Sequence, residues 1–188
     1  MKIVLLEQRS IGMDLDYSRL YRLGSVTANP GCGEEEMKKL IKDADIIVGN
    51  KFFFGERTLD EAPDLKLICA PTTVGINAAA KVLQDEKSSV KLTGLGLPSE
   101  MAEYIGDDDA HSCPYMYLWN PIDVGSLAAY TSIALVNGDI TGAEGDSFTA
   151  GDMGDYEVVD AGDDGTEIIL GAPFKFDSSN IAEWKDVY

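Results

Sequence analysis

Residues 65–95 read LKLICAPTTVGINAAAKVLQDEKSSVKLTGL and hold two short apolar runs on either side of a helix-like segment. The apolar runs, residues 65–70 and 90–95, are typical of buried strands. Residues 77–86 are predicted to be a helix with Asn77 as its cap. A strand, a crossover helix and a second strand form a β-α-β unit, so these two strands are expected to be parallel.

The same alternation continues on both sides of this stretch. Further strands are predicted at residues 2–6, 25–28, 45–49 and 115–119, and further helices at residues 17–23, 33–43, 98–105 and 121–137. We therefore predict an α/β fold: a doubly wound, flavodoxin-like parallel sheet of five to six strands in the order 2-1-3-4-5-6. Residues 146–150, 156–159 and 167–170 are short and β-rich, which predicts a β-rich C-terminal tail.

Acidic residues are distributed unevenly along the 188-residue chain, whose formal net charge is -18. Residues 1–77 have a net charge of -2 and residues 78–188 have -16. Such a shift in composition indicates a boundary in origin. The length suits one domain, so we predict a single flavodoxin-like domain over residues 1–188, in three parts: 1–77, 78–145 and the tail 146–188.

The acidity also limits the partners of the chain. It disfavours nucleic acid, whose phosphates would be repelled, and anionic membranes for the same reason. No apolar run reaches membrane-spanning length, and the start of the chain does not resemble a secretion signal, so a cytoplasmic location is expected. Three widely spaced cysteines predict neither disulfides nor a metal site.

Patterns that would indicate catalysis are weak. Gly94 and Gly96 lie between a strand and a helix, but the third glycine of a dinucleotide fingerprint is missing. His111, the single histidine, lies in an acidic loop without a nucleophile motif, and we expect it to be solvated rather than to bind metal with Asp107 and Asp109. We predict no catalytic residue, metal or cofactor.

The run 43–51 and the run 65–77, after the opening strand at residues 1–7, resemble the N-terminal domain of D-2-hydroxyacid dehydrogenases. This resemblance implies that the loop Thr73-Val74-Gly75 offers backbone N–H groups to a carboxylate, with Asn50 nearby. The alternative is an ordinary strand-to-helix turn. The nucleotide-binding domain and the catalytic Arg, Glu and His of that family have no counterpart in this chain.

The run 90–101, the run 118–125 and the segment 171–181 resemble the C-terminal lobe of periplasmic sugar-binding proteins of the rhamnose and autoinducer-2 kind. This second resemblance covers residues 78–188, and it implies a periplasmic or extracellular location for the parent protein. It also implies that a sugar cleft is lined by Leu97, Pro98, Glu100, Trp119 and Asn120. The alternative is that Trp119 and Asn120 have structural roles.

We interpret the chain as an engineered or naturally recombined, non-catalytic chimera of these two parts, without a complete active site. A second hypothesis is a residual binding module for a small sugar or carboxylate at the carboxyl ends of the strands. A third is a fragment of an NAD-dependent 2-hydroxyacid dehydrogenase. Because a partner lobe is missing, we expect a monomer or a weak homodimer.

Overall fold

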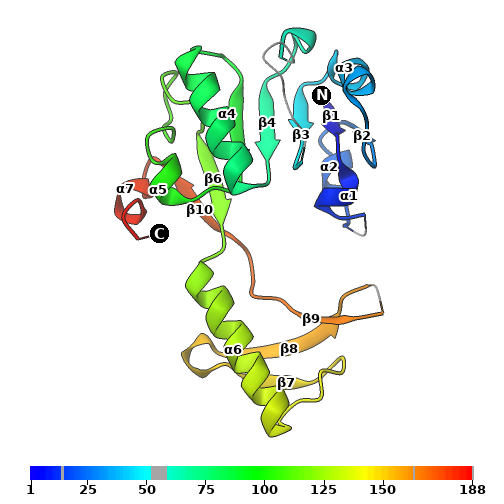
Figure 1. The fold of residues 1–188 in the computed structure, drawn as a ribbon, viewed down its shortest axis with the longest axis vertical. Coiled ribbons are helices and arrows are strands. Elements are labelled where there is room, and N and C mark those ends of the chain that lie inside the picture. The colour runs from blue at the N-terminus through cyan, green and yellow to red at the C-terminus, as the bar shows by residue number, and fades with distance from the viewer. Residues whose placement is uncertain (14, 52–58, 163, 188) are drawn as a thin grey trace. The chain divides into compact units, whose positions relative to one another are not determined.

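A computed structural model describes residues 1–13, 15–51, 59–162 and 164–187. Its contacts divide into two compact units, one of residues 1–118 and 175–188 and the other of residues 119–174. The sequence predicted one domain over the whole chain, and unfolding followed separately in each unit tests that prediction. The elements of both units are labelled in Figure 1.

The first unit contains a five-stranded parallel sheet in the order β2-β1-β3-β4-β5. Its strands are β1 (Lys2–Leu5), β2 (Ser25–Ala28), β3 (Ile46–Val48), β4 (Leu67–Ala70) and β5 (Lys91–Gly94). This order confirms the predicted flavodoxin-like fold class, including the short antiparallel strands toward the C-terminus. Parallel pairing places the carboxyl ends of all five strands at one edge of the sheet.

Two more strands extend this unit. β6 (Tyr115–Leu118) lies beside β5, joined to it by a parallel bridge between Leu95 and Tyr117. β10 (Phe174–Asp177) pairs with β6, so the chain returns to the first unit at its C-terminal end. The segment 175–188, predicted as the end of a β-rich tail, therefore belongs to the flavodoxin-like unit.

The connections in this unit contain the following helices: α1 (Gln8–Ile11), α2 (Ser18–Tyr21), α3 (Glu34–Ile41), the 3-10 turn η1 (Leu59–Glu61), α4 (Thr73–Asp85), α5 (Pro98–Met101) and α7 (Ile181–Trp184). The sequence predicted that α4 starts at Asn77, which is wrong. The helix starts four residues earlier, because Thr72 caps it by accepting a hydrogen bond from the Gly75 N–H.

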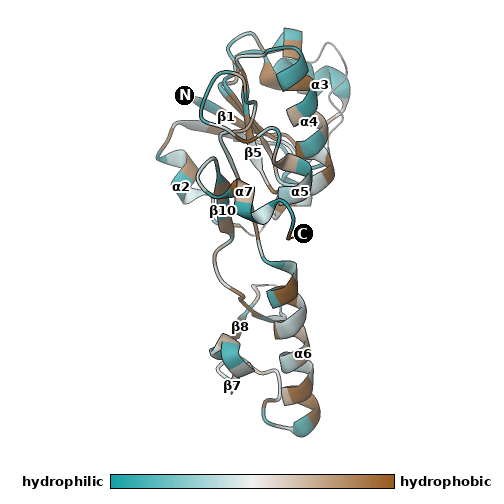
Figure 2. Cartoon of the chain, turned by 90° about the vertical axis from the view of Figure 1, so that its left-hand side faces the viewer, coloured by the Kyte–Doolittle hydropathy of each residue, from teal (hydrophilic) through white to brown (hydrophobic). Residues whose placement is uncertain are grey.

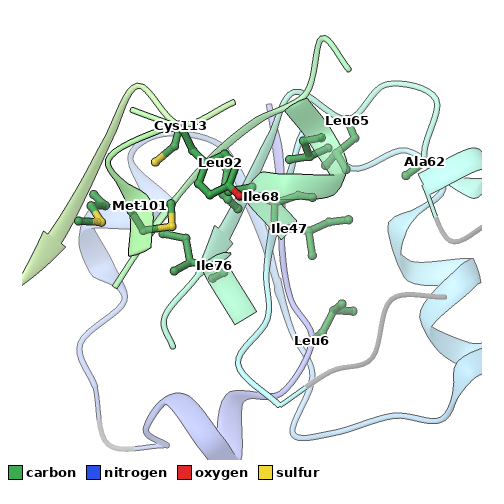
Figure 3. Packing of buried hydrophobic residues seen from close by; sticks show 14 of the residues in the cluster. Leu6, Ile47, Ala62, Leu65, Ile68, Ile76, Leu92, Met101 and Cys113 are labelled. Carbon is green, nitrogen blue, oxygen red and sulfur yellow. The ribbon is translucent and has the colours of Figure 1, made fainter. Parts of the chain in front are cut away.

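One face of the sheet packs against α3, α4, α5 and α7 to form the main core. Val4, Ile47, Ile68 and Leu92 lie beside one another in register on neighbouring strands and are buried in this core. Ile76 of α4 and Met101 of α5 belong to the same cluster (Figure 3). Phe176 of β10 is fully buried in the same cluster and makes an edge-to-face contact with Trp184, with ring centroids 5.8 Å apart. The returning strand is thus integrated into this core.

The second unit consists of α6 (Pro121–Asn137) and a three-stranded antiparallel sheet in the order β7-β8-β9. These strands are β7 (Ser147–Thr149), β8 (Asp155–Asp160) and β9 (Thr166–Ile168), with the 3-10 turn η2 (Gly151–Met153) between β7 and β8. The predicted length of α6 and its end at Gly138, which is left-handed with φ of 79°, agree with the sequence analysis.

The second unit has a small core of its own, centred on Leu127 and Ala134 of α6 and on Phe148 and Val158 of the sheet. Asp146 organises the turn before β7 by accepting hydrogen bonds from the N–H groups of Thr141, Gly142 and Ala143. These bonds, the one from Thr141 first, hold the pKa of the Asp146 carboxyl below its ordinary value.

Candidate functional site

The carboxyl edge of the parallel sheet is the place where ligands bind in open α/β folds. In the first unit the loops after β1, β3, β4 and β5 all end at this edge. The sequence-predicted residues Asn50, Thr73, Val74, Gly75 and Leu97 follow three of these strands directly. The fold therefore places the predicted residues of the first unit along one edge.

Asn50 connects two of the loops at this edge. Its side-chain amide donates a hydrogen bond of 2.7 Å to the backbone carbonyl of Ser10, which lies in α1, the helix that follows β1. Its Oδ1 atom is buried and accepts no hydrogen bond from the described residues. Buried polar atoms nearly always have a partner, and one without a partner costs free energy. This oxygen is therefore suited to accept a hydrogen bond from a donor outside the described chain.

The turn from β4 into α4 supplies backbone donors. Of the predicted donors Thr73, Val74 and Gly75, the Gly75 N–H already donates a hydrogen bond of 3.2 Å to Thr72 Oγ1. The N–H groups of Thr73 and Val74 lie in the first turn of a 13-residue helix, where an α-helix has no internal acceptors for them. The positive end of the helix dipole adds to their attraction for a ligand oxygen.

Gly75 leaves room for the capping hydroxyl at this turn. A Cβ atom at Gly75 would lie 2.8 Å from Thr72 Oγ1, so the hydroxyl that caps α4 would have to move. Val74 beside it is 81% exposed, so its side chain extends from the start of the helix into solvent. A substitution at Val74 can therefore alter the edge without disturbing the core.

The turn from β5 into α5 forms a further part of the edge. Leu97 is half-buried, Pro98 is buried at the first position of α5, and Glu100 is exposed in the first turn. Glu100 also accepts a hydrogen bond of 3.2 Å at its backbone oxygen from Asn77 Nδ2 of α4. Two neighbouring helices that begin at this edge are thus linked.

Gly94 and Gly96 in this turn have packing roles that account for them without a nucleotide. A Cβ at Gly94, whose φ is 149°, would lie 1.9 Å from the carbonyl oxygen of Ala70, and one at Gly96 would meet the sulfur of Met116 at 2.5 Å. Both glycines allow the strand and helix to approach their neighbours closely. The incomplete dinucleotide pattern is therefore explained by close packing.

Trp119 and Asn120 belong to the second unit and have structural partners there. Trp119 Nε1 donates a hydrogen bond of 2.7 Å to the carbonyl oxygen of Gly171. Asn120 caps α6 by accepting a hydrogen bond of 2.9 Å from the Ile122 N–H. These bonds agree with the structural alternative that the sequence left open for both residues.

The acidic loop around His111 is held by internal contacts. His111 Nδ1 lies 2.7 Å from Asp108 Oδ1, and Asp107 accepts a hydrogen bond from the Ser178 hydroxyl. The contact with His111 is the largest cause that lowers the Asp108 pKa. Among the described residues no group of three or more potential metal ligands comes together.

The cysteine thiols are poor nucleophiles in this environment. Burial raises the pKa of Cys113 to about 12 and raises that of Cys69. Burial is also the first cause that raises the pKa of the Cys32 thiol, followed by the charges of Glu36 and Glu7. No thiolate-based chemistry is favoured at these three positions.

Comparison with known proteins connects the fold to sugar-binding proteins. No protein-family model matches the chain, and no curated protein matches it significantly. The chain is similar to an ABC transporter solute-binding protein from Clostridium phytofermentas, solved with bound L-rhamnose. The identity is 47% and the TM-score 0.70, over 100% of this chain and 60% of that protein. The chain thus spans three fifths of the length of this protein.

Two further solved structures share the fold. A sugar ABC transporter protein from Actinomyces odontolyticus is 27% identical with a TM-score of 0.60, over 97% of this chain and 57% of its own. LsrB from Clostridium saccharobutylicum, in complex with AI-2, is 14% identical with a TM-score of 0.57, over 98% of this chain and 59% of its own. At 14% identity the second likeness shows the fold alone.

The predicted dehydrogenase resemblance of residues 1–77 finds only a weak structural counterpart. A putative D-3-phosphoglycerate dehydrogenase from Ralstonia solanacearum overlaps 54% of this chain and 33% of its own at 19% identity. Its TM-score of 0.41 is too low to support an argument about shared origin. The chimera therefore stays a prediction, while the likeness to sugar-binding proteins extends over the whole chain.

None of the described helices is long and apolar enough to cross a membrane.

Proposed function

We propose that this protein is a non-catalytic binding module whose ligand is a small polyhydroxylated molecule of the deoxysugar class. The observation that carries the proposal is the 47% identity, over the whole chain, to a solute-binding protein solved with bound L-rhamnose. The proposed site is the carboxyl edge of the sheet in the first unit, formed by Asn50, Thr73, Val74, Leu97 and Glu100.

The polar groups at this edge match a sugar hydroxyl better than a carboxylate. A hydroxyl can donate a hydrogen bond to Asn50 Oδ1, which has no partner among the described residues, and accept one from the Thr73 or Val74 N–H. An ionised carboxylate can only accept, so it would leave the Asn50 oxygen without a donor. The start of α4 alone would suit either ligand, and this feature supports a small carboxylate as the second candidate.

Titration calorimetry with L-rhamnose tests the proposal, and D-lactate serves as the comparison ligand. We expect heat from rhamnose at millimolar concentration, because the chain spans three fifths of the length of the rhamnose-bound protein and the contacts of the remaining two fifths are not counted on. Asn50→Ala should weaken binding by about tenfold, the factor that a lost hydrogen bond worth about 1.4 kcal/mol gives. Asn137→Ala, which changes an exposed asparagine in the second unit, should leave the affinity unchanged.

Val74→Glu is a second variant that does not depend on the core, because Val74 is exposed. A carboxylate at the start of α4 would compete for the helix N–H groups and should weaken binding of either ligand. Absence of rhamnose heat at millimolar concentration, or equal affinity of Val74→Glu and the unaltered chain, would refute the proposed site. Tighter binding of lactate than of rhamnose would favour the carboxylate.

The recombined origin is a separate proposal. The abrupt change from a net charge of -2 in residues 1–77 to -16 in residues 78–188 supports it. The whole-chain likeness to one solute-binding protein supports the contrary proposal, that both parts derive from one family. Neither origin changes the residues that form the proposed site.

A further inference from the structure

An apolar groove lies within the second unit, between α6 and the strands β8 and β9, with a volume of about 490 Å³. Val124 and Leu135 of α6 form one wall, and Ile168 and Leu170 at β9 form the other. Val124 and Leu135 are 49% and 44% exposed, so the helix only partly covers the sheet. This groove lies outside the sugar site proposed above and has no assigned role.

The groove exists because α6 presents more apolar surface than the small sheet can bury. Hydrophobic segments recur along the helix (Figure 2), and Asp123 is its single charged residue. Of the large apolar side chains on α6, only Leu127 is buried. A helix that is apolar on several sides is normally covered on each of them.

The charge of the second unit identifies the kind of partner that suits the groove. Residues 119–174 contain eleven Asp and Glu residues and no Lys, Arg or His, a net charge of -11. Glu167 lines the groove, while the exposed Asp139 and Glu144 flank the segment of Ile140 and Gly142 at its end. One acidic side chain therefore lines the groove, two more lie within two residues of lining positions, and the sequence of this unit holds no cation to neutralise them.

We propose that this groove, the α6 groove, binds a basic amphipathic peptide segment. Apolar side chains of the segment fill the floor, and its Lys and Arg side chains approach Glu167, Asp139 and Glu144. Val124 and Leu135 are eleven residues apart on α6, so the groove follows about 16 Å of helix. The i, i+4 and i+7 anchors of an amphipathic helix span about 10 Å, so they fit within that length.

Charge also decides against the alternative occupants. A second copy of this chain would bring another -18 overall and another unit without a basic residue, so two copies repel each other at this face. Anionic ligands and membranes are repelled in the same way. A basic segment gains attraction from the same acidic side chains that exclude these partners.

Fluorescence anisotropy with a labelled helical peptide of Leu and Lys tests the proposal, using the full chain at low salt. The matched peptide has Glu in place of every Lys. We expect micromolar binding of the Lys peptide that weakens as salt is added, and no binding of the Glu peptide. Leu135→Ser and Glu167→Lys should each weaken binding of the Lys peptide by about tenfold, since each removes one anchor or one charge contact.

Two control variants separate the groove from general attraction to an acidic protein. Val82→Ser matches Leu135→Ser, because Val82 is 49% exposed on α4 of the first unit. Glu86→Lys matches the charge change of Glu167→Lys at an exposed position after α4. Both controls should retain the affinity of the unaltered chain within about twofold.

Several results would overturn the proposal. These are no binding of the Lys peptide at low salt, binding of the Glu peptide to the same extent, or equal effects of the groove and control variants. A molecular mass that doubles with concentration in sedimentation, and that Leu135→Ser returns to the monomer, would show that a second copy occupies the groove instead.

Discussion

Single residues at the strand ends decide how closely the sheet and its helices approach one another. Gly94 has a φ of 149°, and an added Cβ would lie 1.9 Å from the Ala70 carbonyl oxygen. We predict that Gly94→Ala destabilises the protein strongly, because both the backbone and the neighbouring strand would have to shift. Gly125→Ala in α6, with open space around it, should stabilise the protein by about 0.5–1 kcal/mol. Denaturant unfolding measures both; similar stabilities for the two variants would contradict this account.

Asp177 gives a residue-scale prediction about pH. Hydrogen bonds from Ser179 and then Lys175 lower the pKa of this carboxyl to about 2. The pKa of Asp177 is lower in the folded than in the unfolded chain. Its contribution to the free energy of unfolding is therefore complete above the ordinary pKa near 4 and is lost as the pH falls toward about 2. The urea concentration at the unfolding midpoint should therefore decrease as the pH is lowered from about 4 to about 2. This decrease should be less steep in Asp177→Asn. An unchanged slope in this variant would argue against the assignment.

At the scale of elements, α6 carries both buried and exposed apolar side chains. Leu127 is 6% exposed in the core of the second unit, and Val136 is 87% exposed. We predict that Leu127→Ala costs about 2–5 kcal/mol of unfolding free energy, through lost burial and a cavity. Val136→Ala should change it by less than about 0.5 kcal/mol. The difference in urea midpoint followed by the fluorescence of Trp119 checks this, and equal losses would contradict the described orientation of the helix.

Elements were also the level at which the sequence was most informative. Apolar runs located β1, β3, β4 and β5, because buried parallel strands are rich in apolar residues, whereas the half-polar run Ser25–Ala28 gave a weaker signal for β2. The predicted start of α4 was four residues too late. Thr72, the residue that caps the helix, directly follows Pro71, and no charged residue in the first turn marks the start of the helix. Ile46, Val48 and Leu67 of β3 and β4 are half-buried and alternate with the buried Ile47 and Ile68.

The candidate site was predictable only in part. Asn50, Thr73 and Leu97 each follow the end of a parallel strand. The topology of the sheet alone therefore places them at one edge. The hydrogen bond from Asn50 to Ser10, and the absence of a donor to the Asn50 oxygen among the described residues, depend on tertiary packing, and no local pattern signals them. The α6 groove was missed for the same reason: an apolar helix predicts burial and does not show which side remains uncovered.

At the scale of the whole molecule, the two tryptophans report on the two units. Trp119 lies in the second unit and Trp184 in the first, so Trp184→Phe and Trp119→Phe each leave one reporter. The second unit has a small core, and small cores give marginal stability. We expect the Trp119 signal to change at lower denaturant than the Trp184 signal. Coincident transitions would instead support the single domain that the sequence predicted.

The central claim, that the chain is a binding module with its site at the sheet edge, is tested most directly by amide NMR during titration with L-rhamnose. We predict that the largest shifts occur at the Asn50 side-chain amide and at the backbone N–H groups of Thr73 and Val74, with little change in residues 119–174. A spectrum that does not change at millimolar rhamnose, or shifts confined to residues 119–174, would contradict the claim.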